Sequence, residues 1–514
     1  MNWQGERWTA EQVLALAPDA ASQKAGGKLS TPAPWSGGGT RDGALWGLCA
    51  GSGGKPYQTV VDLSGPAYRC SCPSRKFPCK HALGLLLLWA TGEPVPEAEP
   101  PAWAEEWLSG RRQRAAAGGG RGAAAAGGER DAADVEAAAR RRADRVEQRE
   151  RRIAAGTTEL ERRLADLVRD GLAGADRSGY AQWDETAARM VDAQAPGLAA
   201  RVRELGAITA SGADWPSRLL EECALAHLLG EGFRRVADLP APLAATTRTR
   251  VGLTTDTAEL LASAEPVRDH WLVLARQDTD DGKLTTRRLW LRGSRTGRLA
   301  LLLSFGAAGR APELALPVGL TLDADLAFYP AARPLRAVLG TRYGTTNDDM
   351  TGAAGAPPAG AVGAPPGDAT GGPPGVGVSA ALAAYGTALR DDPWLEAWPV
   401  VLSQVVPVPD AAALEALATS SGAQHGGRRD GAAGADGGAR PRSGADGWQL
   451  ADADGVLALP VDPRCATDLW QLAAISGGEP LTVFGECGHR GFTPLTAWNG
   501  TPVALAARRH RATP

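Results

Sequence analysis

The sequence predicts an α+β protein built from several small domains. Its 514 residues exceed the roughly 100–200 residues of a typical single domain. Short apolar runs bounded by Gly and Pro, which are typical of strands, occur near both ends of the chain, whereas much of the middle has apolar residues at helical spacing. Two long stretches rich in Gly, Pro and Ala separate these regions, and we expect them to be disordered linkers.

The composition limits the classes of partner. Hydrophobic residues make up 44% of the chain and can fill a core, and a net charge of -3 gives no general attraction to nucleic acid or acidic membranes. The first residues, 1–12, lack the apolar run of a secretory signal, and the apolar run 82–90 is about half the length of a membrane span. The seven cysteines are too sparse for a disulfide framework. We expect a cytoplasmic protein with no membrane partner.

The first ninety residues contain signals for a helix, several strands and a second helix. Residues 9–12 form a capping box ahead of an apolar run, which predicts a helix that ends near Gly26. Residues 79–91 predict a helix that is apolar on nearly every side and is therefore packed against other elements. The predicted strands cover residues 45–48, 57–63 and 67–69.

Three cysteines and a histidine lie close together between the last strand and the second helix. Cys70 and Cys72 form a C-x-C pair, and after six intervening residues Cys79 and His81 form a C-x-H pair. Residues i and i+2 of a strand point to the same side, so Cys70 and Cys72 can reach one ion together. Thiolates and imidazoles are the ligands that Zn²⁺ prefers. The four residues are therefore the predicted zinc ligands.

Four protein ligands would fill the tetrahedral shell of the ion and leave no position for a reactive water. The predicted site is thus structural, and metal binding would supply on the order of 10 kcal/mol of folding free energy to this small unit. The alternative is three buried cysteines beside a core histidine.

This pattern, C-x-C, then C-x-H, then an apolar helix, resembles the SWIM zinc finger family. The stretches 7–12, 55–57 and 79–85 are similar to SWIM-domain proteins of high-GC actinobacteria, and the resemblance covers about the first ninety residues. It implies a small ββα zinc finger that binds DNA or other proteins. It also implies a bacterial setting in which such proteins accompany MoxR-type AAA ATPases and von Willebrand A-domain proteins.

Composition divides the chain into eight predicted parts. The expected order is a SWIM zinc-finger domain (1–92), a flexible linker (93–128), a helical region (129–265), a small β-rich region (266–344), a Gly/Pro/Ala linker (345–377), a helical block (378–419), a second low-complexity linker (420–446) and a C-terminal α+β unit (447–514).

Basic residues in and beside the finger are candidate contacts for nucleic acid or a partner. Arg75, Lys76 and Lys80 lie within the ligand loop, and residues 1–92 carry nine basic and five acidic residues, a net charge of +4. Ordinary solvated charge is the alternative. The arginines at 111–114 lie in the predicted flexible segment, and those at 140–152 alternate with acids as on a solvated helix.

Other motifs favour structure over chemistry. Cys487 and His489 repeat the C-x-H spacing, but no C-x-C pair lies nearby, so a buried cysteine in a turn is preferred to a second zinc site. Residues 278–282 read as a hairpin turn and not as a calcium loop. We find no phosphate-binding loop and no catalytic pair. Five tryptophans near the finger are expected to fill its core and not to stack on bases: Trp3, Trp8, Trp35, Trp46 and Trp89.

The sequence therefore predicts a zinc-binding, non-enzymatic interaction protein whose finger is a docking platform for an unidentified protein partner. A bacterial AAA-ATPase assembly is the partner that the resemblance implies, and no small-molecule substrate is expected. A nucleic-acid-binding protein that uses the basic rim of the finger is the alternative. An enzyme located after Arg250 is a third hypothesis.

Overall fold

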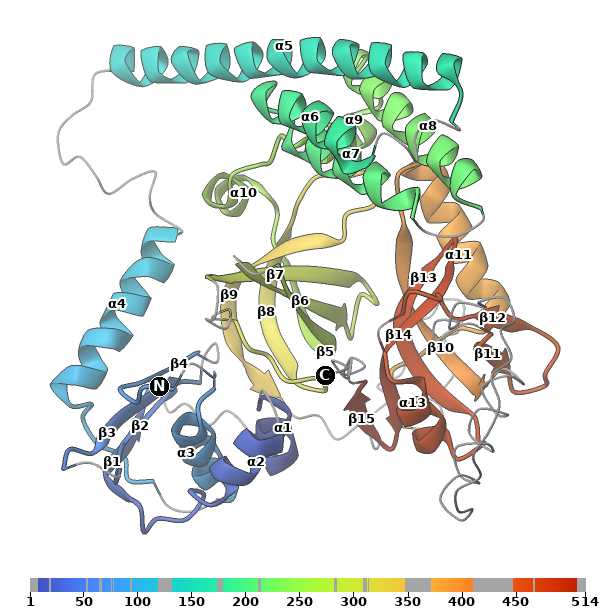
Figure 1. The fold of residues 1–514 in the computed structure, drawn as a ribbon. Coiled ribbons are helices and arrows are strands. Elements are labelled where there is room, and N and C mark those ends of the chain that lie inside the picture. The colour runs from blue at the N-terminus through green and yellow to red at the C-terminus, as the bar shows by residue number, and fades with distance from the viewer. Residues whose placement is uncertain are drawn as a thin grey trace, which may run out of the picture.

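The computed structural model describes most of the chain. The described residues are 8–17, 20–51, 54–63, 67–74, 76, 78–92, 95–118, 132–172, 179–210, 214–281, 284–307, 312, 314–346, 371–409, 447–465 and 467–505. They form an N-terminal sheet domain, a helical bundle, a closed β-barrel and a C-terminal sheet domain (Figure 1). The predicted linkers 345–377 and 420–446 lie largely outside these residues.

The N-terminal domain is a four-stranded antiparallel sheet packed on helices. Its strands are β1 (Trp35–Arg41), β2 (Ala44–Cys49), β3 (Tyr57–Asp62) and β4 (Ala67–Cys70), in that spatial order. The helices are α1 (Ala10–Ala15), α2 (Ala20–Gly27) and α3 (Lys80–Ala90).

Two expectations for this domain are confirmed, one is wrong, and one covers only part of the sheet. The capping box is present, because Thr9 Oγ1 accepts from the Gln12 backbone while the Gln12 side chain accepts from the Thr9 backbone. Helix α3 is buried from His81 to Trp89, as its all-round apolar sequence predicts. The single predicted N-terminal helix is two short helices. The finger segment has the expected ββα order in β3, β4 and α3, and its sheet continues through β2 to the edge strand β1, whose Gly-rich sequence gives no strand signal.

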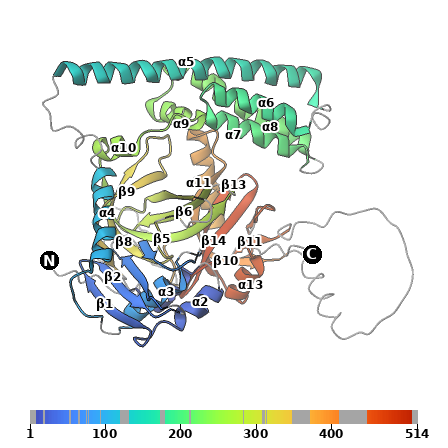
Figure 2. The ribbon, with the colours of Figure 1, turned by 60° about the vertical axis from the view of Figure 1, so that its left-hand side comes forward.

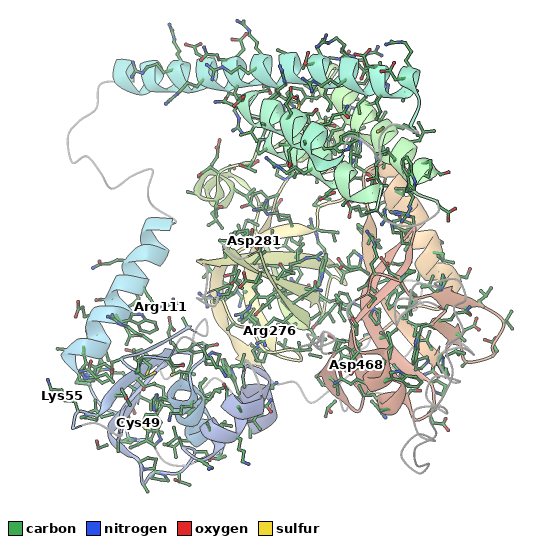
Figure 3. All side chains as sticks on the ribbon, viewed as in Figure 1. Cys49, Lys55, Arg111, Arg276, Asp281 and Asp468 are labelled. Carbon is green, nitrogen blue, oxygen red and sulfur yellow. The ribbon has the colours of Figure 1, made fainter. Side chains whose placement is uncertain are left out.

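The prediction of a flexible linker over residues 93–128 is wrong for Ala102–Gly118, which form helix α4. Its Ala104 and Leu108 pack with Trp46 of the finger sheet, so burial of an apolar face outweighs the weak helical pattern of the sequence. Arg111 of α4 forms an ion pair with Asp62 of β3 at 3.0 Å. Figure 3 labels Arg111 on α4, where the helix rises from the finger domain.

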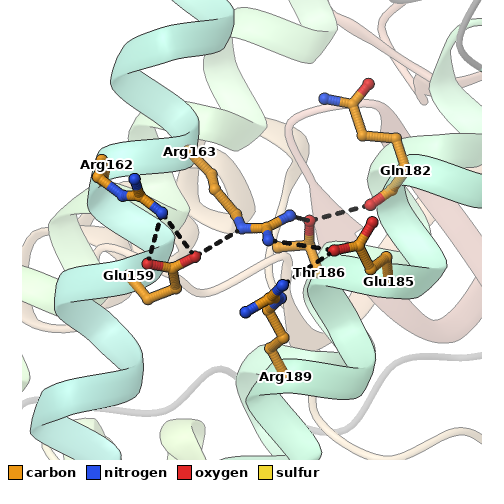
Figure 4. A network of polar contacts seen from close by, with 7 residues as sticks. All are labelled: Glu159, Arg162, Arg163, Gln182, Glu185, Thr186 and Arg189. Carbon is orange, nitrogen blue, oxygen red and sulfur yellow. Dashed lines mark hydrogen bonds and ion pairs between the residues drawn. The ribbon is translucent and has the colours of Figure 1, made fainter.

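The helical region begins with α5 (Ala132–Asp170), a 39-residue helix that follows the predicted long charged helix closely. It continues with α6 (Gly179–Asp192), α7 (Pro196–Ile208), α8 (Trp215–Arg234), α9 (Ala241–Val251) and α10 (Thr257–Ser263). Leu160 and Leu164 of α5 are buried in the bundle core. A polar network joins α5 to α6, in which Arg163 donates to Glu159 on its own helix and to Thr186 and Glu185 on α6 (Figure 4).

The β-rich region is a closed five-stranded barrel, which a linear pattern of strands could not reveal. Its strands are β5 (Val267–Asp280), β6 (Leu284–Gly293), β7 (Leu299–Ala307), β8 (Thr321–Phe328) and β9 (Arg336–Thr346), in the order β5-β6-β7-β9-β8. Residues 278–280 pair with the start of β6 in the β5–β6 hairpin as expected, and Asp278 pairs with Arg287 at 2.6 Å; Gly282 lies outside the described residues.

In the C-terminal sheet domain, the prediction of a helical block over residues 378–419 is only partly right. That block is helical only in α11 (Val378–Asp391), and Ala397–Val408 forms the central strand β10. A run of Val and Leu buried against α11 and α13 favours a strand over a helix. The remaining elements are β11 (Gln449–Asp452), β12 (Ala458–Pro460), α13 (Leu469–Ser476), β13 (Leu481–Gly488), β14 (Gly491–Asn499) and β15 (Thr501–Ala504).

The four parts pack against one another. Leu83, Leu85 and Trp89 of α3 belong to the same buried cluster as Trp271 and Leu289 of the barrel. On the other side of the barrel, Trp290 of β6 meets Phe484 of β13 with ring centroids 6.2 Å apart. Figure 2 shows the finger domain below the barrel and α5 above it. In the described parts of the chain, no helix has both the length and the apolar character needed to cross a bilayer.

Candidate metal centre

The metal centre is built where the finger sheet meets the start of α3. Cys70 is the last residue of β4 and is paired with Thr59 of β3. Cys79 is the N-cap of α3, with extended backbone, and His81 lies in the first turn of the helix. The ligands therefore come from the end of a strand and the start of a helix.

The four predicted ligand side chains lie together. One donor atom from each of Cys70, Cys72, Cys79 and His81 falls within 4.8 Å of the other three. Cys70 Sγ is 3.7 Å and Cys79 Sγ is 4.0 Å from His81 Nδ1. Cys79 and His81 are buried, whereas Cys70 and Cys72 are half-buried, so the cluster lies just beneath the surface.

Electrostatics favours a cation in this cluster once its thiols ionise. A hydrogen bond from Cys79 lowers the pKa of Cys70 to about 4, while the same bond and burial raise the pKa of Cys79 well above its ordinary value. Burial also raises the pKa of Cys72. Three thiolates so close together repel one another, and burial disfavours each charge. A divalent cation removes both costs.

The donor set fits zinc. Three sulfurs and one imidazole nitrogen are the ligands of closed structural zinc sites, and four protein ligands would leave a bound ion no open position for substrate. The backbone N–H of Ala82 points at Cys79 Sγ at 3.5 Å, so the N-terminus of α3 favours a thiolate at this position.

Family models match two parts of the chain. The SWIM zinc finger model matches residues 59–90, which contain all four ligands, and the model of the SWIM-associated four-helix bundle domain matches residues 148–251. This chain carries a SWIM zinc finger. Comparisons with the curated proteins and with the solved structures gave no match. The matched models say nothing of the source organism, so the actinobacterial origin stays a prediction.

Two residues that support the SWIM cluster were not among the predicted site residues. A hydrogen bond joins Thr59 Oγ1 and Cys70 Sγ at 3.3 Å, and the Tyr57 ring lies against the His81 ring with centroids 4.8 Å apart. Such outer contacts orient metal ligands. The sequence contains a signal for both residues: Tyr57 and Thr59 are two residues apart on the predicted strand before the ligand strand, so their side chains share a face.

The basic rim of the SWIM finger lines a groove. Lys76 and Lys80 are exposed, and together with α2, Tyr57 and His81 they enclose a volume of about 510 Å³. Arg75, the third predicted contact residue, lies outside the described residues. The groove itself was not predicted, because it depends on how α2 packs beside the ligand loop.

The remaining sequence candidates are structural. Cys487 and Cys465 are buried in the C-terminal core, and His489 Nε2 accepts from Arg490 Nε at 3.1 Å. Of the five tryptophans near the finger, Trp8, Trp46 and Trp89 are buried and Trp35 is half-buried, whereas Trp3 lies outside the described residues. These four side chains fill the domain core, as expected.

A second group of metal-ligating atoms was missed in the sequence. Glu161 of α5 and His227 and Glu231 of α8 bring their ligand atoms within 4.8 Å of one another. However, Glu231 forms ion pairs with Arg234 and Arg235, and His227 Nδ1 is hydrogen-bonded to Glu161 at 2.5 Å. These pairs already satisfy the charges, so the group acts as a surface ion-pair network.

Proposed function

We propose that the SWIM finger is a docking platform for a segment of a protein partner and that the chain is not an enzyme. The groove beside the Cys/His cluster carries this proposal. Its volume of about 510 Å³ lies within the roughly 300–1,000 Å³ of typical ligand pockets and suits a few residues of an extended segment.

The lining of the groove indicates what such a segment contains. Leu29, Ala25 and Tyr57 give the lining apolar and aromatic surface, and Lys76 and Lys80 give it two basic side chains. An apolar side chain of the bound segment would cover this apolar surface, and a neighbouring carboxylate of the segment would pair with a lysine. An acidic segment with one apolar anchor is therefore the best complement.

The zinc site gives the platform its rigidity. Cys72 and His81 line the groove and also belong to the metal cluster, so a bound ion would hold these two lining side chains in place. A preformed groove loses less conformational entropy on binding than a mobile loop does. This role needs no open metal position, which agrees with a closed four-ligand shell.

Nucleic-acid binding is the second candidate, favoured by the two exposed lysines of the rim. Three arginines elsewhere in this part of the chain form ion pairs with acids: Arg111 with Asp62, Arg112 with Glu105 and Arg41 with Glu99. Tight binding to a phosphate backbone generally uses several cations. The described lining of the groove contains two, Lys76 and Lys80, so we place protein docking first.

An AAA-ATPase-type partner remains a proposal that rests on the family resemblance alone. Assembly with a purified ATPase of this class, measured by analytical ultracentrifugation, would test that identity separately from the groove.

The groove is tested by placing a photo-cross-linking amino acid at Ser74, which lines it, or at the exposed Glu106 of α4 as a control. We expect one defined protein to cross-link in cells from position 74 and not from position 106, and Lys80→Glu to abolish the product. Equal cross-linking from both positions would contradict docking at the groove. Salt-sensitive binding of a DNA duplex that Lys76→Ala and Lys80→Ala abolish, without a cross-linked protein, would favour the nucleic-acid candidate.

A further inference from the structure

A second groove lies on the helical bundle, where α5 passes over α9. Residues of both helices, of the loop after α9 and Pro330 of the barrel enclose about 550 Å³. α5 continues past the bundle toward its N-terminus (Figure 1). None of its lining residues belongs to the finger domain.

The floor of the groove is apolar and made of small side chains. Ala241, Ala244 and Ala245 of α9 follow one another at helical spacing on one face, and Leu253 extends that face beyond the helix. Val146 of α5 completes it with 49% of its surface exposed. Small residues allow the backbone of another helix to approach closely, and an exposed valine next to them leaves apolar surface uncovered.

Arginines from both helices line the groove beside these apolar residues. Arg145 and Arg149 of α5 and Arg248 of α9 line the groove. Arg141 continues the four-residue spacing of the α5 arginines beyond the lining and completes a stripe along that helix. Four-residue spacing places like charges side by side, which destabilises a helix unless anions compensate.

Their contacts show how little of this charge is compensated. Arg145 donates to the Arg141 carbonyl at 3.1 Å and Arg149 donates to the Gly252 carbonyl at 3.0 Å, neither of which carries a formal charge. Arg248 pairs with Glu150 at 3.0 Å. Three arginines and one glutamate line the groove, so it has a surplus of two positive charges.

We propose that this groove binds an acidic amphipathic helix of a protein partner. Carboxylates spaced by one helical turn along that helix would face the Arg141–Arg149 stripe, while its apolar face would cover the alanines and Val146. A nucleic-acid backbone would satisfy the arginines but would leave the apolar floor in contact with water. The proposal is independent of the groove beside the zinc cluster.

The test uses a fluorescently labelled 15-residue peptide in which Leu and Glu alternate at helical spacing. We expect saturable binding to the full-length protein by fluorescence anisotropy, with at least a fivefold loss of affinity in Arg145→Ala. Ala241→Trp, which fills the floor, should abolish binding. Arg152→Ala, an exposed arginine on α5 that does not line the groove, is the matched control and should bind as the wild type does.

The variants place their changes at exposed positions, so unchanged circular dichroism melts would show that each protein is folded. Equal binding of a scrambled peptide of the same composition would overturn the proposal. The same conclusion follows if Arg152→Ala loses as much affinity as Arg145→Ala, or if a 20-nucleotide oligothymidine binds and the peptide does not.

Discussion

Trp394 donates its indole N–H to the backbone carbonyl of Leu225 at 3.0 Å, across 169 residues of sequence. Trp394 precedes the central strand of the C-terminal sheet, yet its side chain is 4% exposed and lies in the core of the helical bundle. Two residues before it, Asp392 forms an ion pair with Arg250 of α9 at 2.6 Å. These contacts hold the bundle to the C-terminal domain.

Replacing Trp394 should therefore separate the bundle from the C-terminal sheet. Trp394→Ala removes a large buried ring and should cost about 3–5 kcal/mol of unfolding free energy. Trp394→Phe keeps most of the packing and loses the hydrogen bond, so it should cost less. Urea denaturation would measure both variants. Equal stability of Trp394→Ala and wild type would show that the two domains are held elsewhere.

Metal content is the direct test of the finger. Mass spectrometry of protein purified without chelator should find about one zinc per chain, and both Cys72→Ser and His81→Ala should lose it. Cys49→Ala is the matched control, since Cys49 is buried in the same domain but is not among the clustered ligands. Figure 3 labels Cys49 in the finger domain. Absence of zinc in the wild type would contradict the assignment.

Zinc removal should also affect the barrel. The side chains of α3 share a buried cluster with Trp271 of the barrel. Removing the metal would withdraw on the order of 10 kcal/mol of binding free energy and should loosen both α3 and the barrel. We expect a strong chelator to increase the binding of an apolar dye and to shift tryptophan fluorescence. A chelator effect that hydrogen exchange confines to residues 70–81 would contradict this coupling.

A buried carboxylate should make stability depend on pH. Burial alone would raise the pKa of Asp269, but hydrogen bonds from Thr296 and from the backbone N–H groups of Arg295 and His270 outweigh it and lower the pKa. A lowered pKa means that the ionised carboxylate stabilises the fold above its unfolded pKa of about 3.9. This contribution is lost as the pH falls through the folded value.

Asp269→Asn tests that dependence. At pH 7 the variant should be about 1–3 kcal/mol less stable than the wild type, because the buried donors lose their charged acceptor. Below about pH 4 the difference between the two proteins should shrink. Thermal melts of both proteins across this range would measure it. A difference that does not change with pH would show that the charge of Asp269 is unimportant.

One glycine in the bundle should tolerate no side chain. A Cβ at Gly197 of α7 would lie 2.0 Å from the Arg250 carbonyl oxygen, so Gly197→Ala must push α7 away from α9 and should cost about 1–3 kcal/mol. Gly386 of α11 has nothing within 4 Å of the same position. Gly386→Ala should therefore stabilise the protein by up to about 1 kcal/mol. Denaturant titrations that rank the two variants in the opposite order would contradict this packing.

The local sequence was enough to predict those features that depend on residues close together in the chain. The Thr9–Gln12 capping box, the buried helix after Cys79 and the clustering of Cys70, Cys72, Cys79 and His81 all depend on spacings of two to eleven residues. Such spacings fix which groups can meet, because strand and helix geometry repeat over the same short distances.

The tertiary structure decided everything that depends on distant segments. Val400 and Leu402 form a strand because α11, α13 and neighbouring strands bury them, and the strands of residues 267–346 close into a barrel because β5 pairs with β8. The two grooves arise likewise, from α2 beside the ligand loop and from α5 over α9. Burial and strand pairing between remote segments outweigh local propensity, so the sequence alone predicted the metal ligands but not the surfaces around them.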